Sequence, residues 1–332
     1  MPDMDRRQLL GATALAGAAL TSGATIAAGH QGGEMADLTG QTVLITGCSS
    51  GFGNLAATLF ARRGAKVIAT MRNLPRREAD DMLQVVADEN LDIHVVEIDV
   101  TSDESVAAGV AEAERLAGGA LDILVNNAGI AVGTTVELQD MDATELIFDT
   151  NVFGPQRVSR AALPRMREAG KGLIFNVSSQ LGRVIIPGFG LYSASKFALE
   201  AQSEQMAYEL AQHGIEVCVI QPGGYPTEIW ENSNQLTQAL LDRTDEARKD
   251  AYAAIVATAI RSESGSSTDP MDVPNAMLEV AAMPAGTRPL RRPVHPGTKP
   301  QLAINEVSAK TQLAMLGGSP YGPAIRAVQN EA

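Results

Sequence analysis

Several residue types are scarce in this chain of 332 residues, which has two cysteines, four histidines and one tryptophan. Two cysteines could form at most one disulfide. Because Cys48 and Cys218 each lie in or beside a predicted buried strand end, we expect two free thiols instead. The histidines are scattered along the chain without the spacing of metal ligands. No metal site is therefore expected.

Basic residues are also scarce relative to acidic residues. The chain has 26 Lys and Arg residues against 39 Asp and Glu residues, a formal net charge of −13. Nucleic-acid binding requires clustered Lys and Arg, so nucleic acid is not an expected partner. With 45% hydrophobic and 20% charged residues, the composition is that of a globular protein with a well-buried core. There is no internal repeat.

The chain lacks a strongly hydrophobic run of membrane-spanning length. Its longest apolar stretch, residues 9–28, is rich in Ala, Gly and Thr and therefore weakly hydrophobic. It follows the pair Arg6-Arg7 and ends in small residues, as a twin-arginine signal peptide does. We expect residues 1–28 to direct export to the periplasm, leaving no stable membrane span after processing. The alternative is a cytoplasmic protein with an unprocessed N-terminus.

From residue 42 onward, short apolar runs alternate with segments of helical periodicity. Strands are predicted at 42–46, 66–71, 93–100, 121–125, 172–177, 215–220 and 289–294. The helices predicted between them span 51–63, 76–89, 102–117, 142–167 (bent near Pro155) and 191–213. This alternation predicts an α/β fold: a Rossmann-like doubly wound parallel sheet of about seven strands with helices on both faces.

The expected domain organisation follows from this pattern. Residues 29–40 are Gly-rich and polar and are predicted to be a linker. Residues 41–295 are predicted to form a single catalytic domain, with a mostly helical substrate lid at about 227–270. The C-terminal extension, residues 296–332, has several Gly and Pro residues and no clear period.

The stretch ITGCSSGFG, residues 45–53, places three glycines between a predicted strand and a predicted helix. Backbone N–H groups and the helix dipole can bind a phosphate at such a junction. The spacing differs from the G-x-G-x-x-G dinucleotide fingerprint. Taken alone, the stretch fits an ordinary glycine turn equally well.

Four further signals fall at or near the carboxyl ends of later strands, where doubly wound sheets bind ligands. They are the turn Asn126-Asn127-Ala128-Gly129, then Asn151, then Ser179, and finally Tyr192 with Lys196. Tyr192 and Lys196 are four residues apart, so they share one face of a helix. A Tyr–Lys pair at this spacing is usually a surface pair, but the neighbouring signals favour a functional role.

Together these residues resemble the short-chain dehydrogenase/reductase family over about residues 40–227. The resemblance covers the T-G-x-x-x-G-x-G motif at 46–53, the N-N-A-G turn, the P-G-x-x-x-T segment at 222–227 and the catalytic-type Asn151, Ser179, Tyr192 and Lys196. The sequences of the stretches ITGCSSGFG and ATMRN are most similar to those of the hydroxysteroid and retinol dehydrogenase-like branch. The resemblance implies an enzyme that transfers a hydride between a nicotinamide and an alcohol, ketone or aldehyde carbon. It also implies a homo-oligomer, a dimer or a tetramer.

The expected chemistry centres on a tyrosine. Its ordinary pKa is about 10, too high for a good base at neutral pH. The nearby Lys196 cation would favour the phenolate, so Tyr192 could act as acid and base. Ser179 can hydrogen-bond the substrate oxygen. The resemblance implies that Asn151 supports a water-linked proton path to Lys196, and that Lys196 also contacts the cofactor ribose.

NADP is the expected cofactor, with NAD as the alternative. An NAD site commonly has an acidic residue at the end of the second strand, but here Met71 stands there and Arg72 follows. An arginine suits a 2′-phosphate. By resemblance, Asp99 contacts the adenine. The expected cofactor contacts are Thr46, Gly47, Ser49, Ser50, Gly51, Phe52, Gly53, Arg72, Asp99, Val100, Asn126, Ala128, Gly129, Tyr192, Lys196, Pro222, Gly223 and Thr227.

The substrate is expected to be a fairly apolar alcohol or carbonyl compound. Apolar residues are frequent in the loop 184–189 and in the lid region 229–241, although core packing or a dimer contact explains them equally well. Two other functions remain open: an epimerase or dehydratase on the same scaffold, and a non-enzymatic or weakly active cofactor-binding sensor or scaffold. The presence of both Tyr192 and Lys196 favours an enzyme over a sensor or scaffold, and an epimerase or dehydratase would be expected to have a longer substrate domain than this sequence shows.

Overall fold

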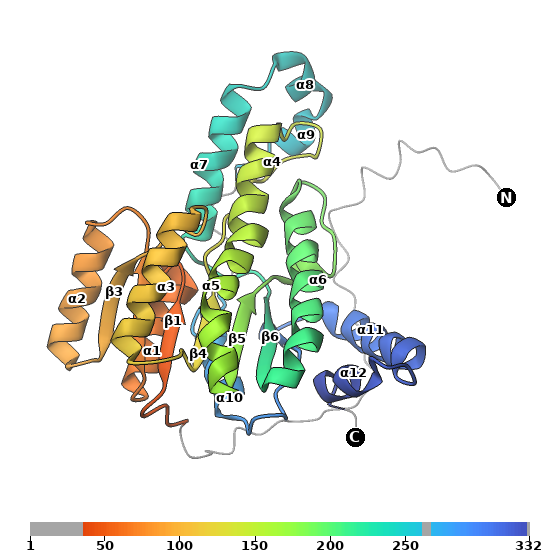
Figure 1. Cartoon of the computed structure of the whole chain (residues 1–332). Coiled ribbons are helices and arrows are strands. Elements are labelled where there is room, and N and C mark those ends of the chain that lie inside the picture. Colours follow the sequence, from red (N-terminus) through yellow and green to blue (C-terminus); the bar gives the residue numbers. More distant parts are fainter. Residues whose placement is uncertain (1–35, 261–266, 331–332) are drawn as a thin grey trace. The chain divides into compact units, whose positions relative to one another are not determined.

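The computed structural model describes residues 36–260 and 267–330, so the predicted signal segment 1–28 lies outside the described residues. The described part of the chain contains a seven-stranded sheet of order β3-β2-β1-β4-β5-β6-β7 (Figure 1). Every neighbouring pair of strands is parallel. The predicted doubly wound α/β fold is confirmed.

The strands lie close to their predicted positions, and two of the differences at the carboxyl edge concern predicted site residues. β3 ends three residues early, which places Asp99 and Val100 in the following turn, whereas β4 continues to Asn126, which pairs with Asn176 of β5. Both differences matter for the site because they decide which residues leave the sheet. The strand bounds are β1 Thr42–Ile45, β2 Lys66–Met71, β3 Ile93–Glu97, β4 Ile123–Asn126, β5 Gly172–Val177, β6 Ile215–Pro222 and β7 Arg291–Val294.

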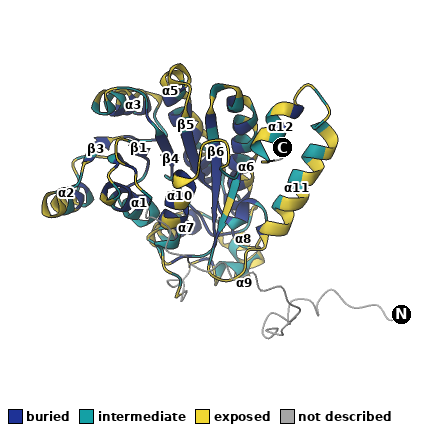
Figure 2. Cartoon of the chain, turned by 90° about the horizontal axis from the view of Figure 1, so that it is seen from below, coloured by how far each residue is buried: buried dark blue, intermediate teal, exposed yellow. Residues whose placement is uncertain are grey.

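Helices cover both faces of the sheet (Figures 1 and 2). One face of the sheet is covered by three helices: α1 (Gly51–Arg62), α2 (Arg77–Glu89) and α10 (Asp272–Ala282). On the other, α3 (Asp103–Ala117), α5 (Gly154–Ala169) and α6 (Tyr192–Leu210) pack against the opposite side. Successive strand residues alternate between these two cores, so the strands read as nearly continuous apolar runs.

The long helix predicted at 142–167 is interrupted. α4 (Met141–Phe148) leads into a π-helical turn (Asp149–Phe153), and α5 begins at Gly154. Pro155 has no N–H and cannot donate to the carbonyl of Asn151, while the N–H of Gly154 donates to Asp149 five residues back. The predicted bend near Pro155 is therefore a π turn, and that turn contains Asn151.

Helices α7 (Ile229–Asp242), α8 (Glu246–Ala251) and α9 (Ala253–Val256) form the described part of the lid, above the carboxyl ends of the strands in Figure 1. Within the described ranges, no helix combines the length and apolar character needed to cross a membrane.

The two ends of the described chain differ from the expectations. The tail beyond 296, predicted without clear periodicity, forms α11 (Gln301–Leu316) and α12 (Gly322–Val328). Gln301 is the one fully buried residue of α11, so the helix has no apolar stripe for a periodicity argument to detect. At the other end, Leu38 of the predicted linker is fully buried in the core beside α1.

Candidate active site

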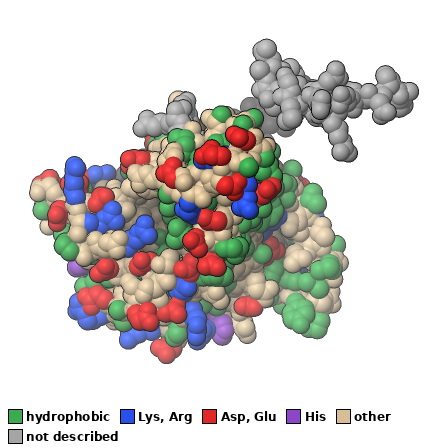
Figure 3. All heavy atoms as spheres, turned by 90° about the horizontal axis from the view of Figure 1, so that it is seen from above, with side chains coloured by type: hydrophobic (Ala, Val, Ile, Leu, Met, Phe, Trp, Pro, Cys, Tyr) green, Lys and Arg blue, Asp and Glu red, His purple; other side chains and the backbone are tan. Residues whose placement is uncertain are grey.

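The carboxyl ends of the strands border a cleft of about 570 Å³. It lies at the reversal of strand order between β1 and β4, where open parallel sheets bind ligands. Figure 3 looks onto this edge and shows basic, acidic and hydrophobic side chains around it. The predicted site residues that line the cleft are Gly47, Ser49, Ser50, Gly51, Phe52, Arg72, Asp99, Val100, Ala128, Gly129, Ser179, Tyr192, Lys196, Pro222, Gly223 and Thr227.

Close backbone packing explains two of the three glycines in the β1–α1 turn. Gly47 has a φ of +71°, and a Cβ there would lie 2.9 Å from the Cα of Ala128. A Cβ on Gly53 would lie 2.4 Å from the carbonyl oxygen of Gly47. Gly53 does not line the cleft, so its role is to let the first turn of α1 fold back on the strand end.

Thr46 also lies behind the cleft wall. Its Oγ1 accepts hydrogen bonds from the backbone N–H groups of Asn127 and Ala128, both at 3.0 Å. The glycine turn and the N-N-A-G turn are thereby fixed to each other.

The N-terminus of α1 opens toward the cleft. Ser50 is extended and its side chain does not cap the helix, and the first turn contains no acidic residue. The unpaired N–H groups of this turn and the positive end of the helix dipole suit an anionic group such as a phosphate.

Two arginines lie at the rim of the cleft beyond β2. Arg72 is exposed, and Arg76, which the sequence reasoning missed, also lines the cleft. Arg76 donates to the carbonyl oxygen of Arg72 at 3.3 Å and forms an ion pair with Glu78 at 2.8 Å. The run ATMRNLPRR, in which basic residues recur after the strand, was the available signal.

Asp99 follows β3 on the same side of the cleft. Burial tends to raise the pKa of its carboxyl, but hydrogen bonds from Thr101 and the nearby charges of Arg72 and Arg157 outweigh burial and lower it. Its Oδ1 accepts from the N–H of Thr101 at 2.9 Å and from the hydroxyl at 2.7 Å. Asp99 is therefore a fixed, ionised acceptor.

Ser179, Tyr192 and Lys196 come together on one wall of the cleft. Ser179 is the second residue after β5 and forms a hydrogen bond with Tyr192, which lies in the first turn of α6. The Lys196 Nζ lies 5.7 Å from the centre of the Tyr192 ring and donates to the carbonyl oxygen of Val177 at 3.0 Å.

Burial governs the electrostatics of this group. It raises the pKa of Tyr192 to about 12, while the hydrogen bond with Ser179 acts in the opposite direction. Burial lowers the pKa of Lys196 to about 8, against the charge of Glu200. The expectation that Lys196 brings the tyrosine pKa below its ordinary value is wrong for this structure, because burial raises that pKa and the opposing contribution comes from the hydrogen bond with Ser179.

Asn151 lies next to Lys196 but does not line the cleft. Its Nδ2 donates to the carbonyl oxygen of Ile130 at 2.9 Å and to Ser195 Oγ at 3.1 Å, while its Oδ1 accepts from the N–H of Ile130. A Cβ on Gly129 would lie 3.3 Å from Asn151 Oδ1 and 3.5 Å from Lys196 Nζ. The side chain thus holds the loop after β4 against the lysine.

Asn126, expected to contact the cofactor, instead lies inside the sheet. Its Nδ2 donates to Ser159 Oγ at 3.0 Å and to Asn176 Oδ1 at 2.8 Å. The reason is the extra residue of β4, which keeps Asn126 in register with β5. Its neighbour Asn127 lines the cleft and uses its amide to bind the carbonyl oxygens of Thr46 and Gly47.

Aromatic residues form the other end of the cleft. The Phe189 ring lies 6.4 Å from Tyr192 and 6.3 Å from Trp230, and the Trp230 indole N–H donates to the carbonyl oxygen of Tyr225 at 2.7 Å. Of the other apolar residues suspected from the sequence, Ile186, Ile229 and Leu236 also line the cleft.

The remaining apolar residues of these two segments lie elsewhere. Leu240 and Leu241 are buried in separate clusters, and Ile185 is exposed. For these residues core packing or the surface, not the cleft, explains the apolar composition.

The cysteines do not belong to the reactive group. Cys48 and Cys218 are free and fully buried, and the Cys48 thiol donates to the carbonyl oxygen of Ile45 at 3.2 Å. Burial raises the pKa of Cys48 to about 12. Over residues 36–260 and 267–330, no group of three or more His, Cys, Asp or Glu side chains is arranged to hold a metal ion.

Comparison with known proteins gives consistent similarities. A family model described as short chain dehydrogenase matches residues 41–238. The uncharacterized oxidoreductase YusZ of Bacillus subtilis is 36% identical over 258 residues, covering 77% of this chain and 89% of that protein. Human retinol dehydrogenase 8 is 34% identical over 281 residues, covering 82% and 87%. A short-chain dehydrogenase structure from Streptomyces avermitilis is 29% identical with a TM-score of 0.64, covering 83% of this chain and 96% of that one.

Proposed function

The chain belongs to the short-chain dehydrogenase family, and on this basis we propose that it is an NADP-dependent oxidoreductase that interconverts a secondary alcohol and a ketone, or an aldehyde and its alcohol. One observation carries the proposal. Ser179, Tyr192 and Lys196 share a wall of a cleft that has two arginines at one end and aromatic side chains at the other.

The residues of the cleft fit a dinucleotide. The open N-terminus of α1 and the Cβ-free backbone at Gly47 suit a pyrophosphate, and Asp99 offers a fixed acceptor for the adenine end. Arg72 and Arg76 at the rim would hold a 2′-phosphate and favour NADP over NAD. The nicotinamide of this cofactor supplies or accepts the hydride.

The side chains of the chain manage the proton. Tyr192 is neutral at physiological pH because its pKa is about 12, so it can donate its proton to the oxygen of a carbonyl substrate. In the reverse direction the phenolate of Tyr192 takes the proton from the alcohol. Ser179 orients the substrate oxygen by a hydrogen bond. Lys196, cationic below a pH of about 8, stabilises the phenolate that remains after proton transfer.

The aromatic end of the cleft supports a fairly apolar substrate. Phe189 and Trp230 offer broad apolar surfaces beside Tyr192, and the similarity to a protein named as a retinol dehydrogenase agrees with such a substrate class. The purified protein should therefore be assayed for NADPH and NADH oxidation with ketones and aldehydes that range from short and polar to long and apolar. We expect NADPH and the apolar carbonyl compounds to be preferred.

Two outcomes would contradict the proposal. Oxidation of neither cofactor with any carbonyl compound would overturn the activity, and a clear preference for NADH would overturn the role of the arginines. The variants Arg72→Ala and Arg76→Ala separate these points, because each should raise the KM for NADPH and leave the KM for NADH nearly unchanged. Arg77→Ala is the matched control, since Arg77 is exposed and does not line the cleft.

We further propose that the N-terminal segment directs twin-arginine export, with the folded protein carrying its cofactor. The layout of Arg6-Arg7, the weakly hydrophobic run and its small-residue end supports this. Cell fractionation with sequencing of the mature N-terminus tests it: a periplasmic chain that begins near residue 29 is expected. An intact Met1 in the cytosol would contradict it.

A further inference from the structure

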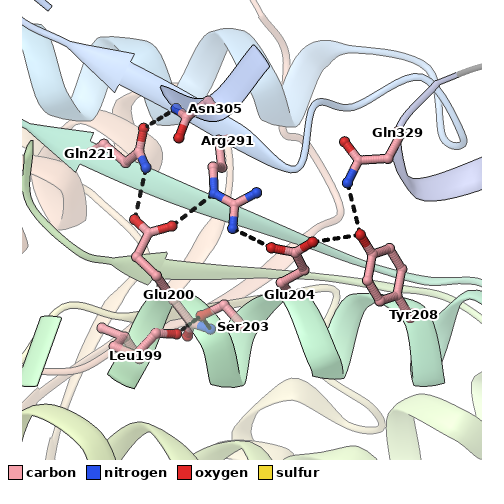
Figure 4. A network of polar contacts seen from close by, with 10 residues as sticks. Leu199, Glu200, Ser203, Glu204, Tyr208, Gln221, Arg291, Asn305 and Gln329 are labelled. Carbon is pink, nitrogen blue, oxygen red and sulfur yellow. Dashed lines mark hydrogen bonds and ion pairs between the residues drawn. The ribbon is translucent and has the colours of Figure 1, made fainter. Parts of the chain in front are cut away.

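A buried polar network lies behind the catalytic turn of α6 (Figure 4). Glu200 and Glu204 follow Lys196 by one and two helical turns, and Arg291 of β7 contacts both. Its Nε lies 2.8 Å from Glu200 Oε2 and its Nη2 lies 2.6 Å from Glu204 Oε2. The side chains of Arg291 and Glu200 are only 6% and 2% exposed, so solvent does not screen this pair.

The second oxygen of Glu200 leads to the C-terminal extension. Glu200 Oε1 accepts from Gln221 Nε2 at 2.8 Å, and Gln221 Oε1 accepts from Asn305 Nδ2 of α11 at 2.7 Å. Gln301, in the first turn of α11, donates to the backbone oxygen of Gln221 at 3.2 Å. Gln221 immediately precedes Pro222, which lines the cleft, so α11 contacts the strand end at the cleft directly and is joined to α6 through Gln221.

The second oxygen of Glu204 leads to α12 in the same way. Glu204 Oε1 accepts from the Tyr208 hydroxyl at 2.6 Å, which accepts from Gln329 Nε2 at 2.8 Å, just beyond α12. Each carboxylate on α6 therefore joins Arg291 to one of the two C-terminal helices. Burial of apolar side chains adds little to the packing of these two helices on the domain. In α12 the large apolar side chain that is buried is Ile325, and in α11 no apolar side chain is fully buried.

A close contact connects the network to the reacting group. The short 3₁₀ turn Gln180–Gly182, directly after Ser179, packs on α6 between Lys196 and Glu200. A Cβ on Gly182 would lie 3.1 Å from the Lys196 carbonyl oxygen, 3.0 Å from Glu200 Cγ and 2.7 Å from Ser178 Oγ. The turn after Ser179 and this part of α6 are thus too tightly packed to shift independently.

Charge reaches Lys196 through the same residues. Against strong desolvation, the carboxylate of Glu200 acts to raise the pKa of the lysine. Facing that carboxylate are Arg291 from β7 and Arg183, which follows the 3₁₀ turn, with Glu204 on the next turn of α6. These charged groups surround Glu200, whose own charge acts on the lysine.

We propose that Glu200 and Arg291, held in place by Asn305 of the C-terminal extension, are positioning residues for Lys196. The extension is then a support of the active site: it fixes the carboxylate whose position sets both the location and the charge of the lysine. This inference rests on the proposed function, because Lys196 is given its role there.

The test compares pH profiles of kcat for carbonyl reduction in the wild type, Glu200→Gln, Asn305→Ala and the control Glu306→Ala, which alters an exposed ion pair on α11. Glu200→Gln removes the negative charge, so Lys196 loses its proton at lower pH and the alkaline limb should move down by about 1 pH unit. Asn305→Ala should lower kcat several-fold with the KM for the carbonyl substrate unchanged, whereas Glu306→Ala should match the wild type.

Thermal unfolding of each variant separates positioning from stability. A lower Tm with an unshifted alkaline limb in Glu200→Gln would overturn the inference, as would an Asn305→Ala variant that behaves like Glu306→Ala. Asn305 is only half-buried on α11, so this variant keeps the inference falsifiable if Glu200→Gln does not fold. Absence of turnover in the wild type would overturn the proposed function together with this inference, whereas an active wild type with unchanged variants overturns the inference alone.

Discussion

At the residue scale, burial makes the charged form of both titratable groups of the site less favourable. The tyrosine pKa is raised to about 12 and the lysine pKa is lowered to about 8, both mainly by burial. The lysine nevertheless remains cationic at neutral pH, where its ammonium has one carbonyl partner, Val177. The site therefore holds a charge at a cost in stability, as functional sites commonly do.

Tyr192→Phe tests the proton-transfer role. Removal of the phenolic hydroxyl leaves no other acid at this position of the cleft wall, so turnover should fall by at least about 100-fold. Cofactor binding, measured by fluorescence titration with NADPH, should persist because the ring and the phosphate-binding turn remain. Full turnover in this variant would exclude Tyr192 as the acid and base.

Lys196→Met tests the cost of the buried cation. The pKa of Lys196 in the folded state, about 8, lies below the ordinary value of 10.5, so the folded state loses this proton at lower pH than the unfolded state does. The free energy of unfolding of the wild type therefore rises as the pH rises between these two values. The stability advantage of the variant over the wild type should thus be largest below pH 8. By pH 10.5 it should have decreased by about 3 kcal/mol.

Urea unfolding of both proteins across this pH range measures the difference. Lys171→Met, which alters a largely exposed lysine, is the control and should show no comparable change with pH. A constant difference between Lys196→Met and the wild type would contradict the burial argument.

Gly53→Ala tests close packing between the first turn of α1 and the turn that precedes it. The added methyl group would collide with the Gly47 carbonyl oxygen and Asn127 Nδ2, so the free energy of unfolding should fall by about 1–3 kcal/mol. The KM for the cofactor should rise because the phosphate-binding turn moves. Gly119→Ala is the control, since a Cβ there meets no atom within 4 Å. Equal stability of the two variants would contradict the packing argument.

At the scale of elements, each part of the site depends on where a strand or helix ends. β4 keeps Asn126 inside the sheet, the π turn before α5 holds Asn151 against Lys196, and the start of α6 presents Tyr192 beside Ser179. The lid helix α7 then closes the aromatic end, because its Trp230 contacts Phe189 and is fixed by a hydrogen bond to Tyr225.

Trp230→Ala tests the role of α7 in substrate selection. Loss of the indole removes one aromatic wall and the support of Phe189, so the KM for long apolar ketones should rise much more than the KM for short ones. Gln238→Ala, on the exposed side of the same helix, is the control. A uniform change in KM across the ketone panel would indicate that α7 does not select the substrate.

At the scale of the whole molecule, two apolar cores on the two faces of one sheet position the strands and their flanking helices, and a smaller cluster holds Phe189, Tyr192 and Trp230. We expect the protein to form a homo-oligomer, a dimer or a tetramer, as its family resemblance implies. Sedimentation equilibrium measures the assembly, and a monomer at micromolar concentration would contradict this expectation.

The sequence alone was sufficient for the alternation of strands and helices and for the residues of the reacting group. Buried parallel strands must be apolar, and Ser179, Tyr192 and Lys196 have chemistry and spacing that other residues do not provide. The α11 and α12 helices were not predictable, because they have no apolar stripe and are docked largely by isolated polar side chains, among them Gln301, Asn305 and Gln329.

The sequence by itself therefore determined the sheet and was enough to predict that Ser179, Tyr192 and Lys196 lie at its carboxyl edge, because periodicity and side-chain chemistry are local properties. Only the tertiary structure decided that Asn126 lies in the sheet while Asn127 borders the cleft, that Arg76 joins Arg72 at the rim, and that burial raises the Tyr192 pKa. Register, desolvation and contacts between distant segments depend on the packed chain, so no local pattern contains them.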